Sequence, residues 1–194
     1  MLGKAAVTIW CDVAAEIREE FDHWHAHEHM PERLSIPGFR RGSRWVSADR
    51  GSYFICYELE SENTLTSSAY LERLNNPTAW SKKMMPHHRN MVRGLCRVEA
   101  SSGTALGQVL LTVRSWNATT LDLNALAARK GVVAAHLLRA IAQPPPQTAE
   151  QKLRGGDATP DVVALVTGYH EPAVKSAAVA GATVGLYRLA YVLS

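Results

Sequence analysis

One order of secondary-structure elements occurs twice along the chain, and this limits the possible folds more than any other feature. In the first half, one helical pattern runs from about residue 13 to 30, after the first strand. A second helical region runs from about 64 to 93, after the third strand. The strands themselves are runs rich in β-branched and aromatic residues at 5–11, 39–47, 53–60 and 95–100. The resulting order, β-α-β-β-α-β, predicts an antiparallel sheet with helices on one face.

The second half follows the same plan. Lys130-Gly131-Val132 echoes Pro37-Gly38-Phe39 before the second strand of each half. One short helix capped by Thr119 or Thr120 and one that begins near Pro172 are expected between the strands. These strands are expected at residues 107–116, 133–141, 162–169 and 184–193. Each half is therefore predicted to be a ferredoxin-like unit.

A ferredoxin-like sheet on its own exposes one apolar face, which must be covered. We predict an α+β fold in which two tandem units, residues 1–103 and 104–194, pack sheet to sheet and close one barrel within the chain. The alternative is that each sheet covers a partner chain, and a homodimer stays possible in either case. The polar segment at about 142–160, which begins with three consecutive prolines, is expected to be a long, mobile loop.

Three local features are also expected. Pro31 cannot donate a helix hydrogen bond, so the first helix should stop or kink near Met30. Gly51 should supply the positive φ in the turn after the second strand, and Gly94 should end the helix before the fourth strand. Within the second strand, Phe39, Ser43 and Trp45 should form a covered face, whereas Arg40, Arg44 and Val46 should form a wetter one.

The stretch from Trp24 to Arg33 is the densest in ionisable groups, with three histidines and two glutamates. Helical spacing pairs His25 with His29, His23 with His27, and Glu28 with Glu32 if the helix persists. His29 is the best candidate for an acid–base group, because imidazole titrates near neutral pH and Glu28 or Glu32 could orient it. The alternative is a set of solvated polar residues at a helix end. The second half has no counterpart of this stretch.

Composition excludes several classes of protein. The 194 residues are 46% hydrophobic and 20% charged, as in an ordinary globular protein, and the net charge is only +3. No basic tract predicts nucleic-acid binding, and no apolar run is long enough to span a membrane. Cys11, Cys56 and Cys96 lie far apart in apolar runs, which is typical of buried thiols in a reducing compartment, so we expect a cytoplasmic protein without a signal peptide.

The string Glu28-His29-Met30-Pro31-Glu32-Arg33, followed by Ile36-Pro37-Gly38-Phe39, resembles the dimeric α+β barrel superfamily, close to its EthD-like members. Tyr57-Glu58-Leu59 and Asn76-Pro77-Thr78 add to the resemblance, which covers the first half well and the second only in layout. It implies a small-molecule site in the barrel mouth or between sheet and helices. Members include cofactor-free monooxygenases, cyclases, isomerases and haem-binding enzymes.

The leading hypothesis is therefore an enzyme that moves a proton on a small apolar carbonyl or aromatic compound, as an isomerase, cyclase or cofactor-free monooxygenase. Catalysis is assigned to His29 with Glu28 or Glu32, and Arg33 would stabilise a developing enolate. The substrate-binding residues are predicted to be Trp10, Trp24, His25, Trp45, Tyr53, Tyr57 and His87, with His88 as a further candidate. For each aromatic residue the alternative role is core filling.

Two other functions remain open from the sequence. A barrel that binds a ligand or is purely structural would use Glu32 and Arg33 to lock the fold. A metal or haem site is the third hypothesis, because His25 and His29 have the spacing for one metal, with a carboxylate as a third ligand. No second pair of ligands is evident, so the expected cofactor is none.

Overall fold

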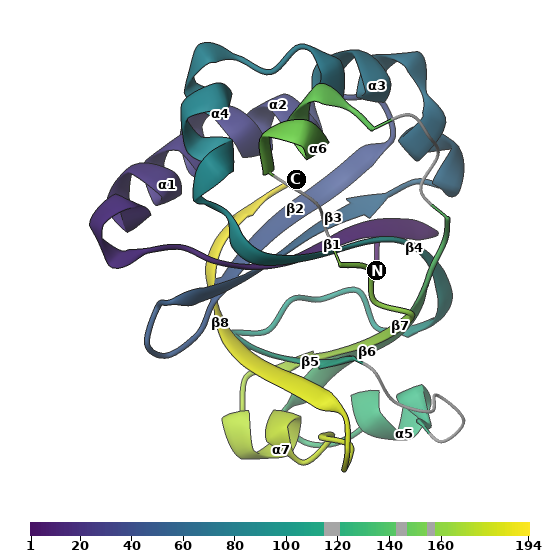
Figure 1. Ribbon diagram of the computed structural model, residues 1–194. Helices are drawn as coiled ribbons and strands as arrows, with labels where there is room; N and C mark the ends of the chain where they lie inside the picture. The colour runs from purple at the N-terminus through teal and green to yellow at the C-terminus, as the bar shows by residue number, and fades with distance from the viewer. Residues whose placement is uncertain (115–120, 143–146, 155–157) are drawn as a thin grey trace.

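The computed structural model describes residues 1–114, 121–142, 147–154 and 158–194, and its strands form one closed barrel (Figure 1). Every strand pairing is antiparallel. The strands are β1 (Ala5–Asp12), β2 (Phe39–Val46), β3 (Ser52–Leu59), β4 (Arg89–Ser102), β5 (Val109–Arg114), β6 (Val132–Ala140), β7 (Val162–Gly168) and β8 (Thr183–Leu193).

The order of strands around the barrel is β1-β3-β2-β8-β5-β7-β6-β4. The first half contributes β4-β1-β3-β2 and the second contributes β8-β5-β7-β6, so both halves have the same internal order. The halves join where β2 pairs with β8 and β4 pairs with β6. The predicted α+β fold, two ferredoxin-like sheets closed into a single-chain barrel, is confirmed. The division after residue 103 falls between β4 and β5.

The described helices lie in two layers on opposite sides of the barrel (Figure 1). The second half carries α5 (Leu123–Ala127) and α7 (Glu171–Lys175). The sheet of the first half is covered by α1 (Arg18–Trp24), the π-helical turn η2 (His25–His29), α2 (Met30–Leu34), α3 (Ser68–Asn75), α4 (Ala79–Met84) and α6 (Ala149–Arg154). Short 3₁₀ turns are η1 (Ala15–Ile17), η3 (Glu62–Thr66) and η4 (Met85–His87). None of these helices is long and apolar enough to span a membrane.

The position of α6 differs from the sequence-based expectation. Part of the expected mobile loop, residues 149–154, is this helix, which packs on α3 and η4 in the helix layer of the first half (Figure 1). Residues 143–146 and 155–157, which include the three prolines, lie outside the described residues. A segment of the second half thus completes the cover over the sheet of the first half.

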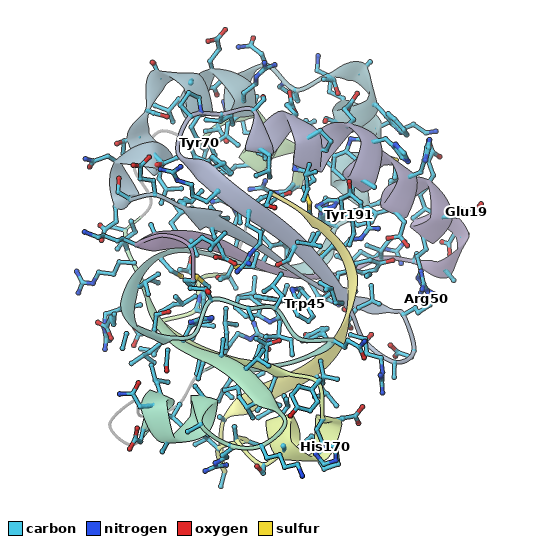
Figure 2. The ribbon with its side chains drawn as sticks, turned by 180° about the vertical axis from the view of Figure 1, so that it is seen from behind. Glu19, Trp45, Arg50, Tyr70, His170 and Tyr191 are labelled. Carbon is cyan, nitrogen blue, oxygen red and sulfur yellow. The ribbon has the colours of Figure 1, made fainter. Side chains whose placement is uncertain are left out.

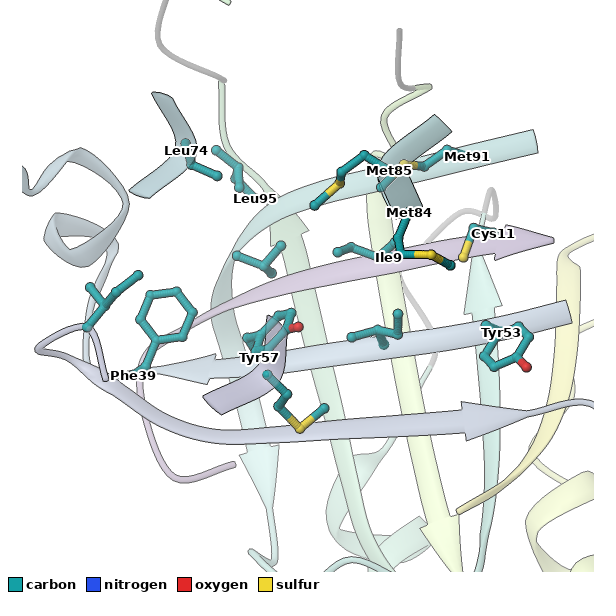
Figure 3. Packing of buried hydrophobic residues seen from close by; sticks show 14 of the residues in the cluster. Ile9, Cys11, Phe39, Tyr53, Tyr57, Leu74, Met84, Met85, Met91 and Leu95 are labelled. Atoms are coloured by element: carbon teal, nitrogen blue, oxygen red, sulfur yellow. The ribbon is translucent and has the colours of Figure 1, made fainter. Parts of the chain in front are cut away.

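Alternating side chains separate two cores. Along β1, Val7, Ile9 and Cys11 face the helices, whereas Ala6 and Trp10 face the barrel interior. Figure 3 shows the helix-facing cluster, in which Ile9 of β1 and Tyr53 and Tyr57 of β3 lie together with Met84 of α4. Both faces of the strand are buried, as its two apolar stripes predict.

Strand β2 corrects the prediction of one covered and one wetter face. Arg44 is only 5% exposed, because it lies under α1. Its Nη1 donates to the Asp22 carbonyl oxygen at 2.8 Å, and its guanidinium lies 5.7 Å from the centre of the Tyr191 ring. On the opposite face, Trp45 is buried inside the barrel (Figure 2). Both faces are covered here because β2 lies between the helix layer and the barrel interior.

Two local expectations were wrong, and a third was confirmed only in part. The regular α-helix is interrupted just before Met30, by the π turn at His25–His29, but helical turns continue in α2. Pro31 lies in the first turn of α2, where no donor is needed. In the turn before β3, Arg50 has the positive φ of 58° instead of Gly51. Strand β4 begins at Arg89, so Gly94 lies within the strand and ends no helix.

Two glycines hold α2 against β2. Gly38 has φ of +94° in the turn between them, and Gly131 has φ of +99° at the matching place in the second half, as the sequence echo suggests. At Gly42 of β2, a Cβ atom would lie 2.9 Å from the Met30 side chain. The absence of a side chain at position 42 therefore lets α2 approach the sheet closely.

Candidate functional site

His25, His29 and Arg33 form one stripe on the sheet-facing side of η2 and α2. The three residues are four positions apart, so a continuous helical segment aligns them. They are exposed by only 1%, 7% and 3%, respectively. The pairs predicted from spacing are present: the His25 and His29 ring centroids lie 5.7 Å apart, and those of His23 and His27 lie 4.4 Å apart. Only the first pair faces the sheet.

His25 binds the sheet through Tyr57. The Tyr57 hydroxyl oxygen lies 3.2 Å from His25 Nε2. Burial raises the pKa of the Tyr57 phenol and lowers the pKa of His25 well below its usual 6.5. Both groups are therefore neutral near pH 7, and the phenol can donate to Nε2. This contact positions the stripe above β3.

His29 is a neutral histidine with an unused nitrogen. Its ring stacks on Trp24 with centroids 4.5 Å apart and planes inclined by 30°. Burial is the main cause that lowers its pKa well below 6.5, and Arg33 adds to the shift. Its Nδ1 atom is buried and has no hydrogen-bond partner among the described residues. A buried imidazole with a free nitrogen can accept a proton from a group brought against it.

A small pocket opens beside His29, between the sheet and the helix layer. Its volume is about 20 Å³, which suits a water molecule. The apolar wall comes from Val7, Ile9, Phe39 and Leu74. Polar groups from six elements complete the lining: His29 of η2, Arg33 of α2, Tyr57 of β3, Tyr70 of α3, Arg93 of β4, and Glu150 and Arg154 of α6.

Glu150 of α6 reaches Arg33 in this pocket. The Arg33 Nη2 atom donates to Glu150 Oε1, and both side chains are almost fully buried. Arg154 Nη1 lies 3.8 Å from the other carboxylate oxygen. Desolvation opposes the charge of Arg33, but Glu150 compensates, so the pKa of Arg33 is raised. The carboxylate of the second half thus neutralises the cation of the predicted motif.

The two motif glutamates have different surroundings. Glu28 Oε1 accepts from Trp24 Nε1 at 3.1 Å, Thr78 Oγ1 at 2.6 Å and Ser81 Oγ at 3.3 Å. It therefore ties the π turn to α4. Glu32 lies 3.8 Å from Arg33 Nη1, and burial raises the pKa of its carboxyl group. No described hydrogen bond joins either carboxylate to His29.

The predicted substrate-binding residues divide into two groups. Trp24, His25 and Tyr57 lie against the His29 stripe, and Tyr53 shares their helix-facing core. Trp10 and Trp45 instead face the barrel interior, on the opposite side of the sheet. Successive side chains of a strand point to opposite faces, so these two tryptophans cannot line a pocket beneath the helices.

The two adjacent histidines that follow α4, both candidates from the sequence, have different surroundings. His87 is half-buried, and its neighbour His88 is the one that turns inward. The ring of His88 lies 5.1 Å from that of Phe21 and 6.1 Å from that of Trp24. His88 is also among the charges that lower the pKa of His25 and His29. Of the two adjacent histidines, His88 belongs with the stripe.

The pocket does not have the form of a metal or haem site. Within the described ranges, no three His, Cys, Asp or Glu side chains converge as metal ligands would. Pockets for drug-sized ligands have volumes of about 300 Å³ or more, and with α6 in place the pocket beside His29 offers about 20 Å³. In this conformation the pocket therefore has no room for haem.

The site contains residues that sequence analysis missed: Tyr70, Arg93, Glu150 and Arg154. One signal for α6 was present. Thr148 and Gln151 have the spacing of a capping box, and the structure shows the reciprocal bonds, from Thr148 N to Gln151 Oε1 at 2.8 Å and from Gln151 N to Thr148 Oγ1 at 3.4 Å. That signature predicts a helix start inside the supposed loop.

Comparison with solved structures identifies the fold. An anthrone oxidase-like protein superposes with a TM-score of 0.58 at 11% identity, over 99% of this chain and 94% of the other. A candidate monooxygenase from Fusobacterium nucleatum subsp. nucleatum gives 0.55 at 9% identity, over 99% and 95%. A candidate monooxygenase from Lactobacillus acidophilus gives a TM-score of 0.51 at 10% identity, over 97% of this chain and 93% of the other. No protein-family model matches the chain, and no curated protein matches it in sequence.

Proposed function

We propose that the protein is a small-molecule enzyme of the monooxygenase type, in which His29 acts as general base. The observation that supports this most is the unpaired, buried Nδ1 of a neutral His29 beside a pocket that also holds Arg33. A neutral imidazole is the protonation state that a base requires. A nearby guanidinium favours the anion that proton removal creates.

The proposed chemistry begins with loss of a proton from an acidic C–H or phenolic O–H group to His29. The substrate becomes an enolate or phenolate, and the positive charge of Arg33 near His29 stabilises it. Such an electron-rich anion can reduce dioxygen, which is the oxidant and the second substrate. For an anthrone the balance is one anthrone and one dioxygen giving one anthraquinone and one water: one oxygen atom enters the former methylene carbon, and the two hydrogens leave with the other.

Other residues of the motif hold the reacting groups in place. Glu28 fixes the π turn through Trp24, and Trp24 stacks on the His29 ring. Tyr57 anchors His25, the next residue of the stripe. Glu32 lies beside Arg33 and tempers its charge. Glu28, Trp24 and Tyr57 are therefore positioning residues, whereas His29 and Arg33 would touch the substrate.

Two observations support this choice of reaction, and a third concerns the compartment in which the protein would work. The neighbours in structure include an anthrone oxidase-like protein and two candidate monooxygenases. The motif from Glu28 to Phe39 resembles EthD-like proteins, and membership of that group is part of the proposal. The three described cysteines are buried and free, which suits a reducing cytoplasm as the working compartment.

The test is turnover of 1,8-dihydroxy-anthrone in air-saturated buffer, followed as oxygen consumption and as absorbance of the anthraquinone product. His29→Gln should lower the rate by about 100-fold or more, because general-base catalysis contributes that much. The matched control is His27→Gln, two residues away on the exposed side of the same turn. Equal rates for the wild type and His29→Gln would contradict the proposal.

A further inference from the structure

Helix α6 fills the space in front of His29. Its residues Glu150 and Arg154 line the pocket beside His29. Its residue Gln151 and the preceding Thr148 line a second pocket next to it. The two pockets share a wall made of Tyr70, Leu74 and Arg93. Each has a volume of about 20 Å³, so neither can hold an organic molecule while α6 is in place. Without α6 they would form one cleft over the sheet.

Guanidinium groups gather at the polar end of that cleft. Its lining includes the guanidinium groups of Arg33, Arg93 and Arg154, and Glu150 is the single carboxylate among the described lining residues. Arg33 is 3% exposed, yet its Nη1 has no hydrogen-bond partner among the described residues. Glu32 Oε2 lies 3.8 Å from this atom, beyond hydrogen-bond distance. A second acceptor oxygen is therefore missing at Arg33, since a guanidinium can bind a carboxylate through two parallel hydrogen bonds.

The opposite wall of the cleft is apolar. Val7, Ile9 and Phe39 line it on one side of the shared wall, and Leu65 and Leu71 line it on the other. A flat hydrocarbon fits such a surface better than a sugar or a peptide does. A ligand that uses both ends carries an aromatic ring system and one carboxylate.

We infer that the ligand of this site is an aromatic carboxylate, whose carboxylate replaces that of Glu150 on Arg33 when α6 is displaced. In the absence of ligand, the Glu150 carboxylate binds Arg33, so Glu150 is an intramolecular competitor of the ligand. This inference rests on the proposed function for the role of His29 as the reacting group. The binding event itself needs no turnover, so it can be measured separately.

The test is calorimetric titration of the full chain with 2-naphthoate and with its neutral isostere 2-naphthamide. The wild type should bind the carboxylate at least about tenfold more tightly than the amide, and Arg33→Met should abolish this preference. Glu150→Gln should bind 2-naphthoate about tenfold more tightly than the wild type, because the internal competitor is weakened. Glu99→Gln, which breaks an exposed pair with Arg139, is the matched control and should change nothing.

A second measurement on the wild type covers the case in which the variants fail to fold. Backbone amides of residues 149–154 should exchange hydrogen faster when 2-naphthoate is bound, since α6 leaves its place in the helix layer. Slower or unchanged exchange in the bound state would overturn the inference, and so would equal affinity for the acid and the amide. Selective binding without any oxidation would leave the inference intact and count against the proposed reaction alone.

Discussion

Arg33 and Glu150 form a buried ion pair between the two halves of the chain, although 117 positions separate them in the sequence. Arg33 lies on α2 in the motif of the first half, and Glu150 lies on α6 in the second. Neither half alone therefore contains a complete site. The pair also affects the electrostatics of the pocket. The Arg33 guanidinium lowers the pKa of His29, and the Glu150 carboxylate offsets part of the Arg33 charge.

The first prediction concerns the stability of this pair. Arg33→Met should lower the free energy of unfolding by about 3–5 kcal/mol, because it leaves the Glu150 carboxylate buried without its main partner. Glu150→Met should cost a similar amount. The double variant should be less destabilised than the sum, since no uncompensated charge remains. Urea unfolding of the four proteins measures the coupling, and strictly additive effects would mean that the pair contributes nothing specific.

The order of elements along the chain and the packing of two sheets could be predicted from the sequence, whereas the pair could not. Period-two apolar patterns and turn residues locate each strand, and the exposed apolar face of a single unit requires a partner sheet. A long-range ion pair leaves no such pattern. Glu150 follows a proline-rich, polar stretch that looks like a loop, and only the Thr148–Gln151 capping box predicts its helix. What that helix packs against depends on tertiary structure.

The second prediction separates the two motif glutamates. Glu28→Ala should lower the free energy of unfolding by about 2–3 kcal/mol, because Thr78 and Ser81 lose a charged acceptor that links α4 to the π turn. Glu32→Ala should cost less than about 1 kcal/mol, since its partner Arg73 is half-exposed. Thermal unfolding of both variants tests the order. A larger loss for Glu32→Ala would mean that Glu32 is the structural lock.

The third prediction concerns the close approach of α2 to β2. Gly42→Ala places a methyl group 2.9 Å from the Met30 side chain, so the helix or the side chain must shift. We expect a loss of about 1–3 kcal/mol in the free energy of unfolding. Gly51→Ala is the control, because its Cβ would meet nothing closer than 3.6 Å and Gly51 does not have a positive φ. Equal unfolding midpoints for the two variants would show that the contact relaxes at no cost.

The limits of sequence reasoning at the site have a common physical cause. Spacing along a helix identifies the His25–His29 face, because the period of a helix is fixed. It gives no information on which side of the sheet an aromatic residue lies, so Trp10 and Trp45 were grouped with Tyr53 and Tyr57. Likewise, His87 and His88 are adjacent, and only the contact of the His88 ring with Phe21 selects His88.

The last prediction is a loss of stability in mild acid. Burial lowers the pKa of His25 and His29 well below 6.5, and lowers that of His136 to about 3. The unfolded chain binds these protons near pH 6.5 and the folded chain does not, so stability is complete above that pH and falls as pH decreases below it. One pH unit below 6.5, each histidine should have removed about 1.4 kcal/mol from the free energy of unfolding. Urea unfolding at pH 7.5 and 5.5 should therefore differ by about 4 kcal/mol, and by about one third less in His136→Gln. His136 lies on β6 of the second half, away from the His25–His29 stripe. An unchanged difference in the His136→Gln variant would show that the acid sensitivity comes from other groups.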